Sequence, residues 1–169
     1  MSGKIDIHTR KFGIEDYDAA AQLWQGVEGV DIAEGDSKEE IARYLLRNPG
    51  LSRVAFIERS TTEPAGAERR GRKSPRGLMS RAANQSMVGV ALCGHDGRRG
   101  YIYHLAVDPK HQGRGFGKRL LDECLEGLRR AGITRVLIMV ANDNPRGRDF
   151  WKRNGWEELD GATAMGINP

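Results

Sequence analysis

The part of the sequence best suited to chemistry is a turn with three glycines at alternate positions, Gly113, Gly115 and Gly117. A strand-like run, YIYHLAV, precedes the turn, and a helix-like run, KRLLDECLEGLRRAG, follows it. The start of a helix carries unpaired N–H groups and a partial positive charge, and glycine lets a backbone approach a phosphate without a Cβ in the way. Turns alone would need only one or two glycines, so the spacing favours a site for a phosphate-bearing ligand.

Two familiar phosphate motifs do not fit this turn. The dinucleotide pattern G-x-G-x-x-G matches Gly113 and Gly115 but meets Lys118 where its third glycine belongs. The nucleotide pattern G-x-x-x-x-G-K-[ST] matches Gly117 and the lysine after it, but Arg119 stands where serine or threonine is needed. The phosphate-bearing ligand is therefore not bound in either of these two ways.

The pattern that remains is V-x-P-x-x-Q-G-x-G-x-G, which begins at Val107. It resembles the acyl-CoA loop of the GNAT superfamily of N-acetyltransferases, whose pattern Q/R-x-x-G-x-G/A is met here by Gln112, Gly115 and Gly117. The resemblance implies an α/β fold of the GNAT type. Such a fold has a mixed, mostly antiparallel sheet of six to seven strands flanked by about four helices. The acyl-CoA is then expected in the V-shaped splay between strands 4 and 5.

The resemblance extends along nearly the whole chain, apart from residues 60–86. The segment NPRGRDFWKRNGW is similar to the family's N-x-x-A-x-x-x-Y-x-x-x-G-F/Y segment, through Asn144, Phe150, Gly155 and Trp156. The Leu23-Trp24 pair, the run GHDGRRGYIYHLAVDP and the closing AMG look most like the small bacterial YpeA-type branch.

The resemblance implies acetyl-CoA as cosubstrate, with no metal. In that family the pyrophosphate lies on the loop amides, and the pantetheine arm pairs with the preceding strand, whose N–H groups polarise the thioester carbonyl. Arg114 and Lys118 can add charge toward the phosphates, although a solvated basic side chain explains each equally well. Asn144 matches a family residue near the CoA arm and also suits a helix N-cap. The implied cofactor-binding residues are Leu105, Ala106, Val107, Gln112, Gly113, Arg114, Gly115, Phe116, Gly117, Lys118 and Asn144.

The expected reaction is direct acetyl transfer from the thioester to a primary amine, with both substrates bound at once. The amine must be neutral to attack. Neutralising a lysine amine at pH 7 costs about 4.6 kcal/mol, whereas an α-amino group costs only about 1 kcal/mol. A lysine acceptor therefore needs a strong base or a desolvating pocket. The acceptor stays open among a small amine, an amino acid and a protein N-terminus.

The sequence departs from the family at its usual general acid, a tyrosine that protonates the leaving thiolate. Trp151 stands at the matching position, and an indole is no useful acid near neutral pH. Tyr103 is another candidate, although packing on a sheet face explains it better. His104 is a candidate base, but strand alternation points it to the opposite face from Tyr103. Glu34 and Asp36 lie where the family often lines its acceptor site, and solvated loop acids explain both more simply.

Two further functions stay open. Because of Trp151, the chain can instead be an acyl-CoA-binding module with weak or no catalysis. Residues 60–86 hold six Arg or Lys and two Glu, and this excess of basic residues accounts for the whole net charge of +4. Such a basic segment suggests nucleic-acid binding as another function. A mobile solvated loop explains this segment better, because no aromatic residues interleave with its arginines. Dimers occur in the resembled family, so a homodimer is also allowed.

The elements that must position these residues follow from periodicity and turn signals. The second helix starts at a capping box formed by Ser37 and Glu40, and the fourth has Asn144 as its N-cap. The apolar run at 134–141 suits a strand covered on both faces. The expected strands are 4–10, 52–59, 87–94, 101–108, 134–141 and one or two within 156–169, and the expected helices are 14–27, 37–48, 118–132 and 145–154.

Length and composition predict one globular domain, 1–169, with a mobile basic insertion at 60–86. Apolar residues make up 38% of the chain, but the longest suitable run, VLIMVA, is too short to span a membrane. The first residues, MSGKIDIHTR, lack the apolar core of a signal peptide, so a cytoplasmic location is expected. Neither the histidines nor Cys93 and Cys124 have metal-ligand spacing, and both thiols are expected to be reduced and partly buried.

Overall fold

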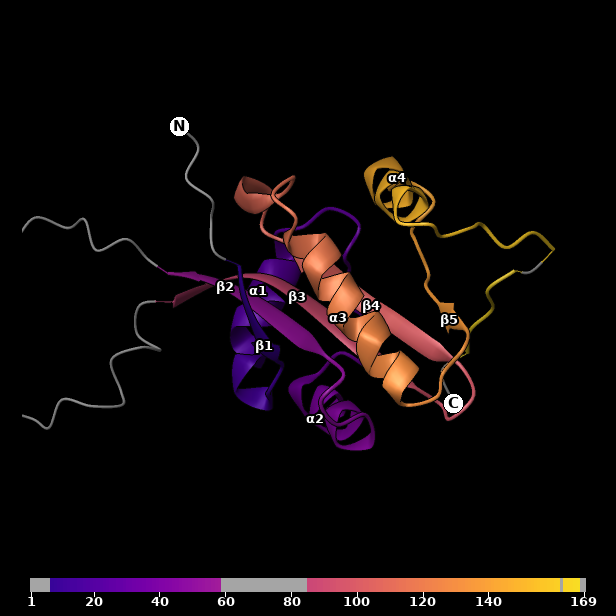
Figure 1. The fold of residues 1–169 in the computed structure, drawn as a ribbon, viewed down its shortest axis with the longest axis horizontal. Helices are drawn as coiled ribbons and strands as arrows, with labels where there is room; N and C mark the ends of the chain where they lie inside the picture. Colours follow the sequence, from indigo (N-terminus) through magenta and orange to yellow (C-terminus); the bar gives the residue numbers. More distant parts are fainter. Residues whose placement is uncertain (1–6, 59–84, 162, 168–169) are drawn as a thin grey trace, which may run out of the picture.

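The computed structural model describes residues 7–58, 85–161 and 163–167, and it contains a five-stranded sheet in the order β1-β2-β3-β4-β5 (Figure 1). The pairs β1-β2, β2-β3 and β3-β4 are antiparallel, and β5 pairs parallel with β4. The predicted mixed, mostly antiparallel sheet is thus confirmed. The strands are β1 (His8–Lys11), β2 (Arg53–Glu58), β3 (Gln85–His95), β4 (Gly100–Val107) and β5 (Val136–Leu137).

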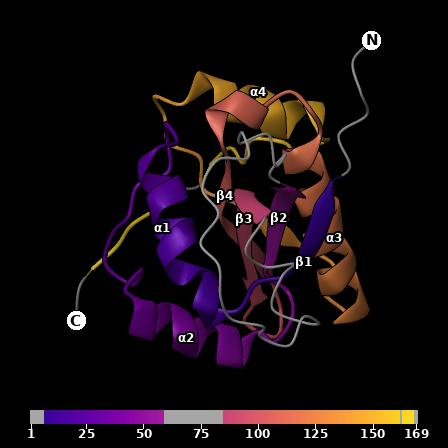
Figure 2. The same ribbon diagram turned by 90° about the vertical axis from the view of Figure 1, so that its left-hand side faces the viewer.

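Within the described residues four α-helices flank this sheet, as the sequence predicts (Figure 2). Helices α1 (Tyr17–Gln25) and α2 (Lys38–Arg47) cover one face, and α3 (Phe116–Arg130) covers the other. Helix α4 (Pro145–Arg153) lies at one end of the molecule, near the start of α3. Short 3-10 turns, η1 (Ile14–Asp16) and η3 (Pro109–His111), precede α1 and the glycine-rich loop.

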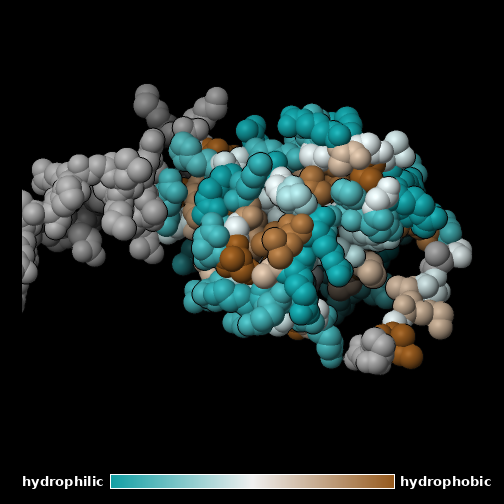
Figure 3. All heavy atoms as spheres, turned by 90° about the horizontal axis from the view of Figure 1, so that it is seen from below, coloured by the Kyte–Doolittle hydropathy of each residue, from teal (hydrophilic) through white to brown (hydrophobic). Residues whose placement is uncertain are grey.

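Apolar side chains fill both faces of the sheet. On the α3 face, Leu120, Leu121 and Leu128 are buried against strands β2, β3 and β4. On the other face, Trp24 of α1 and Ile41 of α2 are buried against the same strands. Seen from below, the outer surface is mainly hydrophilic with small apolar groups between the polar ones (Figure 3). The two cores place β4 between α1 and α3, which matters for the site.

The helix ends follow local sequence signals. Ser37 accepts a hydrogen bond from the N–H of Glu40, whose carboxylate accepts one from the N–H of Ser37, so the predicted capping box is confirmed. Helix α3 ends just before Gly132, whose φ of +78° suits glycine. Asn144 caps α4 with Pro145 at the first position, as predicted.

Within the described residues the sheet has five strands rather than the predicted six or seven. The run 134–141 forms only the two-residue β5, because only Val136 and Leu137 lie opposite residues of β4. Beyond β5 the chain leaves the sheet, and Met139 is 73% exposed, so a strand covered on both faces is wrong for this run. No strand follows α4 within residues 156–161 and 163–167, whose polar and glycine-containing sequence leaves them largely exposed.

Several other predictions concern the chain as a whole. Most of the proposed basic insertion, residues 60–84, lies outside the described residues, while Gln85 and Ser86 belong to β3. The described residues contain no helix long and apolar enough to cross a membrane. They also contain no cluster of three or more side chains that could hold a metal ion. Cys93 and Cys124 are free and fully buried, and the Cys93 thiol together with burial raises the pKa of Cys124.

Candidate active site

A cavity of about 820 Å³ lies where β4 and β5 separate. One wall is β4, from Ile102 to Val107, and the opposite wall is α4 with Met139 and Val140. The loop at 26–31, after α1, and the glycine-rich loop close its ends. The cavity lining includes all the predicted cofactor-binding residues except Ala106 and Arg114, and the side chain of Ala106 is buried in the α1 face of the core. The predicted splay between strands 4 and 5 is thus present as a cavity.

The three glycines of the loop have different structural roles. Gly113 and Gly115 have φ of +72° and +89°, a conformation that side chains with a Cβ rarely adopt. A Cβ added at Gly113 would meet nothing within 4 Å, and at Gly115 only the side chain of Ile7, at 4.0 Å. At Gly117 a Cβ would lie 3.4 Å from the ring of Phe150 in α4. Two glycines therefore shape the loop and leave its backbone open, and the third lets α4 approach α3.

The start of α3 presents backbone N–H groups without partners. Gly115 is the N-cap and has no side chain to cap the helix, and the first turn holds no acidic residue. Within the part of the chain that the structure describes, the N–H groups of residues 112–118 have no hydrogen-bond acceptor. Gln112 donates from Nε2 to the carbonyl of Val107, at 3.0 Å, which ties the loop to the end of β4. Unpaired N–H groups at a helix start are of the kind that can bind an anion.

The cationic side chains of the loop are less specific. Lys118 is 63% exposed and pairs with Asp122, one turn further along α3, at 2.8 Å. Arg114 is exposed and does not line the cavity. The backbone of the loop, rather than these side chains, thus supplies its fixed positive character.

A bulge in β4 changes which way its side chains point. Val90 of β3 pairs with Ala106, but Leu92 pairs with Tyr103, so that His104 and Leu105 together lie opposite a single residue. His104 has φ of +47° and is the only residue other than glycine with positive φ in the described ranges 7–58, 85–161 and 163–167.

The bulge places Tyr103 and His104 on the same face of the sheet. The ring of Tyr103 packs edge-on against Tyr44 of α2, with centroids 6.4 Å apart. The ring of His104 lies against Trp24 of α1, with centroids 4.8 Å apart. The predicted alternation, with these two side chains on opposite faces, is therefore wrong.

His104 is bound to a carboxylate from a distant part of the chain. Its Nε2 lies 2.8 Å from Oδ1 of Asp36, and both side chains are only 15% exposed. Asp36 is fixed in turn: its Oδ2 accepts the N–H of Ala33 at 2.9 Å, and its carbonyl accepts the hydroxyl of Tyr17 at 2.6 Å. The expectation of a solvated loop acid is wrong for Asp36, whereas Glu34 is exposed as expected.

Comparison with known proteins identifies the family. The sequence profile of the Acetyltransferase (GNAT) family matches residues 41–156, which is more than half of the chain. The chain belongs to this family. GNAT proteins are acyltransferases, and the matched range contains the glycine-rich loop, β4 and α4. The resemblance seen in the sequence is thereby confirmed for the family, and no comparison supports the narrower YpeA-type branch.

Individual relatives show how far the likeness extends. A mycothiol acetyltransferase from Beutenbergia cavernae is 43% identical over 72 residues, which are 43% of this chain and 24% of the relative. The match thus spans about a quarter of that relative's length. The PaiA N-acetyltransferase of Thermoplasma acidophilum, solved with coenzyme A, is 19% identical with a TM-score of 0.64, over 93% of this chain and 94% of PaiA.

A second solved structure is the ribosomal-protein-S18-alanine N-acetyltransferase of Escherichia coli. It is 17% identical with a TM-score of 0.61, and the match covers 91% of this chain and 79% of that one. At such identities the two structures establish the shared GNAT fold.

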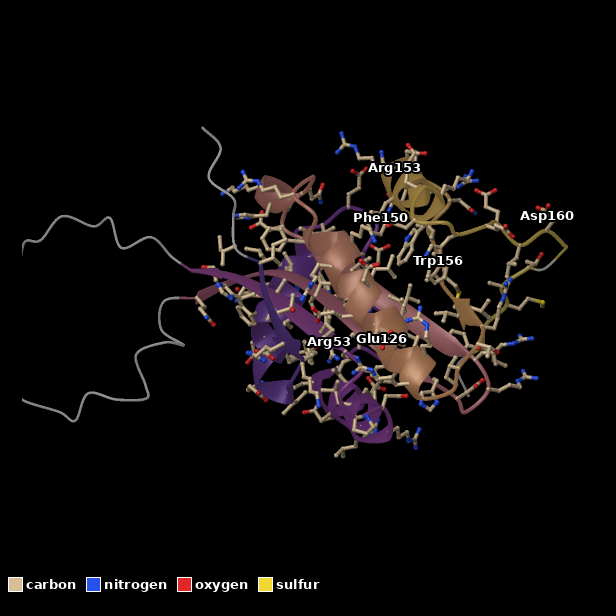
Figure 4. All side chains as sticks on the ribbon, in the orientation of Figure 1. Arg53, Glu126, Phe150, Arg153, Trp156 and Asp160 are labelled. Carbon is tan, nitrogen blue, oxygen red and sulfur yellow. The ribbon has the colours of Figure 1, made fainter. Side chains whose placement is uncertain are left out.

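Trp151, the residue that the sequence resemblance matches to the family's tyrosine, lines the cavity. Its ring packs edge-on against Phe150 and Trp156, with centroids 5.2 Å and 5.0 Å away. Figure 4 shows Phe150 and Trp156 on the side of α4 that faces α3. An indole N–H can donate a hydrogen bond here but cannot supply a proton near neutral pH.

Tyr103 lines the same cavity and is 37% exposed. Burial and the neighbouring Tyr101 ring, stacked at 5.9 Å, raise the pKa of the Tyr103 hydroxyl above its usual value. The phenol therefore keeps its proton throughout the neutral range. Because Tyr103 lines the cavity and is partly exposed, its hydroxyl is within reach of a ligand.

Asn144 connects two walls of the cavity. Its Oδ1 accepts the N–H of Gly147 at 2.8 Å, which confirms the N-cap role. Gly29, in the loop after α1, has φ of +78°, and a Cβ there would lie 2.0 Å from Nδ2 of Asn144. This close approach of α4 to the 26–31 loop was not predicted, and the glycine in VEGV was the only local signal for it.

Proposed function

We propose that this protein transfers an acetyl group from acetyl-CoA directly to a primary amine. The observation that carries the proposal is the row of partner-free N–H groups at residues 112–118, at the start of α3 and beside the cavity. A diphosphate offers several acceptor oxygens and negative charge to such a helix start. PaiA, which shares the fold, was solved with coenzyme A, and this supports the same ligand here.

The edge of β4 fits the rest of such a ligand. Strand β5 pairs only with Gly100 and Tyr101, so within the described residues no strand covers this edge of β4 from Ile102 to Val107. An extended pantetheine arm has amide groups that can pair with an open strand edge. The predicted positions Leu105, Ala106 and Val107 belong to this edge. Its backbone N–H groups would donate hydrogen bonds to the thioester carbonyl oxygen as negative charge develops on it.

The proton at the sulfur needs a donor other than Trp151. We assign this role to Tyr103, which keeps its proton because its pKa is raised, and which lines the cavity. Acetyl-CoA supplies the activated acyl group, so the chain itself needs only to orient, polarise and exchange protons.

The acceptor class is a finer proposal. An α-amino group costs about 1 kcal/mol to neutralise at pH 7, against about 4.6 kcal/mol for lysine. A small amine, an amino acid or a protein N-terminus therefore fits best. The predictions of a YpeA-type branch, a cytoplasmic location, one domain with an insertion at 60–86 and a homodimer stay predictions.

One observation favours a second function. Because Trp151 replaces the family tyrosine, the protein can bind acyl-CoA and turn it over slowly or not at all. Release of CoA from acetyl-CoA, measured with a panel of α-amino and ε-amino acceptors, separates the two functions. We expect CoA release that depends on the amine, with an acetylated product of matching mass. Tight acetyl-CoA binding without amine-dependent release for any acceptor would instead support the binding module.

A further inference from the structure

We propose that His104, oriented by Asp36, takes the proton from the acceptor amine, and that the acceptor is an α-amino compound. The inference rests on the proposed acetyltransferase function and names the group in the chain that makes the amine nucleophilic. Three independent observations point to it: the place of His104 in β4, the hydrogen bond that fixes its ring, and its backbone conformation.

The first observation is where His104 lies relative to the expected thioester carbonyl. His104 lines the cavity directly before Leu105, at the strand edge where the thioester carbonyl is expected. The bulge turns its side chain to the same face as Tyr103, so a proton acceptor and a proton donor share one wall. An amine attacking the carbonyl from this wall would pass both groups.

The second observation is the state of the ring. An ionised carboxylate only accepts hydrogen bonds, so contact with Asp36 places the proton of the neutral imidazole on Nε2. The lone pair is then on Nδ1, the ring nitrogen that does not contact Asp36. Since Asp36 is held by Ala33 and Tyr17, the ring orientation is fixed before any substrate arrives.

The third observation is the backbone. A histidine at φ of +47° adopts a conformation that residues with a Cβ disfavour, and such positions persist only where neighbours hold them. Here Trp24 and Asp36 hold the ring, and the paired strands hold the backbone on both sides of the bulge. An ordinary strand residue would point this side chain to the α3 face, away from Asp36.

Charged and titratable groups reach His104 and its cavity from several elements. From the loop before α2 comes Asp36, from α1 comes Tyr17 through the Asp36 carbonyl, and from β4 itself comes Tyr103. Glu28 and Asp31, from the loop after α1, line the same cavity. Opposite them, the lining includes His111, Lys118 of α3, and Arg146, Asp149 and Arg153 of α4. Acids on this side of the cavity would attract an amine that arrives as its ammonium ion.

The proton balance is simple. The ammonium group loses one proton to Nδ1 of His104, and the freed nitrogen lone pair forms the C–N bond while the C–S bond breaks and its electrons remain on sulfur. The nitrogen then loses a second proton and the sulfur gains one, with Tyr103 as the relay. His104 returns its proton to solvent. An α-amino group gives up the first proton more readily than a lysine side chain, which is why the acceptor class is α-amino.

The test compares His104→Asn and Asp36→Asn with the unchanged protein. Asparagine tolerates positive φ better than most residues, so His104→Asn removes the imidazole with least strain. In Asp36→Asn the amide can donate to Nε2, which reverses the tautomer and leaves Nδ1 protonated. His95→Gln, which removes the histidine at the end of β3 outside the cavity lining, serves as control, and circular dichroism with thermal melting checks folding.

We expect kcat/KM for an α-amine to fall by on the order of 100-fold in His104→Asn at pH 7, and by about tenfold in Asp36→Asn. Acetyl-CoA affinity is expected to stay within about twofold of the unchanged protein, since the loop backbone is intact. As the pH approaches the pKa of the acceptor amine, more of the amine is already neutral in solution and needs no base from the protein. The loss of kcat/KM in both variants should therefore shrink by about tenfold. A structural role would give a deficit that does not change with pH.

Each outcome decides the proposal. A deficit that is constant across pH, or turnover that both variants retain, would overturn the role of His104 while leaving the acetyltransferase function standing. If His104→Asn does not fold, the pH dependence of kcat/KM in Asp36→Asn alone decides between a catalytic and a structural role of His104. A preference for ε-amines over α-amines would overturn the acceptor class. An unchanged protein that turns over no amine would overturn the proposed function, and this inference with it.

Discussion

The two sides of the cavity differ in what supplies their polar groups. On the loop side, residues 112–118 offer backbone N–H groups, and the side chains of Arg114 and Lys118 are exposed or paired elsewhere. On the β4 side, the open strand edge is joined by the side chains of Tyr103 and His104, and His104 is bound to Asp36, 68 residues away in the sequence. The loop therefore depends on glycine conformations, whereas the β4 side depends on a bulge and on side-chain identity.

Because of this difference, acetyl-CoA affinity and turnover should respond to different substitutions. Substitutions that alter the loop backbone should affect acetyl-CoA affinity, and substitutions on the β4 and α4 walls should affect turnover. A single substitution that changed both acetyl-CoA affinity and turnover would show that the same groups serve binding and chemistry.

The largest effect is expected from Gly115→Val. A valine at φ of +89° is strained by about 1–2 kcal/mol, and its side chain covers the open amides of the loop. Acetyl-CoA affinity should fall on the order of 100-fold, about 2.7 kcal/mol, by calorimetric titration. Gly132→Val is the matched control, since Gly132 has φ of +78° with nothing near its Cβ position but ends α3 outside the cavity lining. Equal losses of affinity in both variants would mean that strain alone acts.

Trp151→Tyr tests whether the α4 wall of the cavity contributes to turnover. If this position still reaches the leaving sulfur, a phenol there should raise kcat by about tenfold without changing acetyl-CoA affinity. Trp151→Phe removes the indole without adding an acid, so it should not raise kcat. A similar rise in both variants would trace the effect to the volume of the indole packed on Trp156 rather than to proton donation.

Asn144→Ala tests the link between the two walls. Losing the N-cap bond to Gly147 should lower the free energy of unfolding by about 1 kcal/mol, measured with urea. Asn144→Asp keeps an acceptor oxygen at the cap and should recover most of that loss. Recovery of stability without recovery of acetyl-CoA affinity would indicate that the amide also contacts the ligand.

The smallest effect is expected from Lys118→Met. Lys118 is exposed, and an exposed ion pair between its ammonium group and a phosphate would contribute about 0.2–1 kcal/mol, so acetyl-CoA affinity should change by less than about fivefold. A titration at two salt concentrations measures this. A loss approaching that of Gly115→Val would contradict the view that the loop acts through its backbone.

The sequence predicted features that depend on neighbours along the chain. The capping box at Ser37, the N-cap at Asn144 and the glycine-rich start of α3 are each set within about one helical turn, and each is confirmed. The features that were missed depend on contacts between distant segments. Strand β5 ends where its chain diverges from β4, and the residues of VLIMVA do not themselves encode that point.

The candidate site divides in the same way. The cofactor loop is one continuous stretch, so its residues could be predicted together. The contact of Asp36 with His104 depends on a bulge in β4, and period-two alternation predicts the wrong face without it. A bulge leaves little trace in a sequence when the residue at positive φ is a histidine rather than a glycine.

The most direct test of the central claim is a pair of calorimetric titrations, one with acetyl-CoA and one with S-acetylpantetheine, which carries the same thioester without the diphosphate. If the loop amides hold the diphosphate, acetyl-CoA should bind in the micromolar range and S-acetylpantetheine on the order of 100-fold more weakly. Equal affinities for the two compounds, or no binding of acetyl-CoA, would contradict the account.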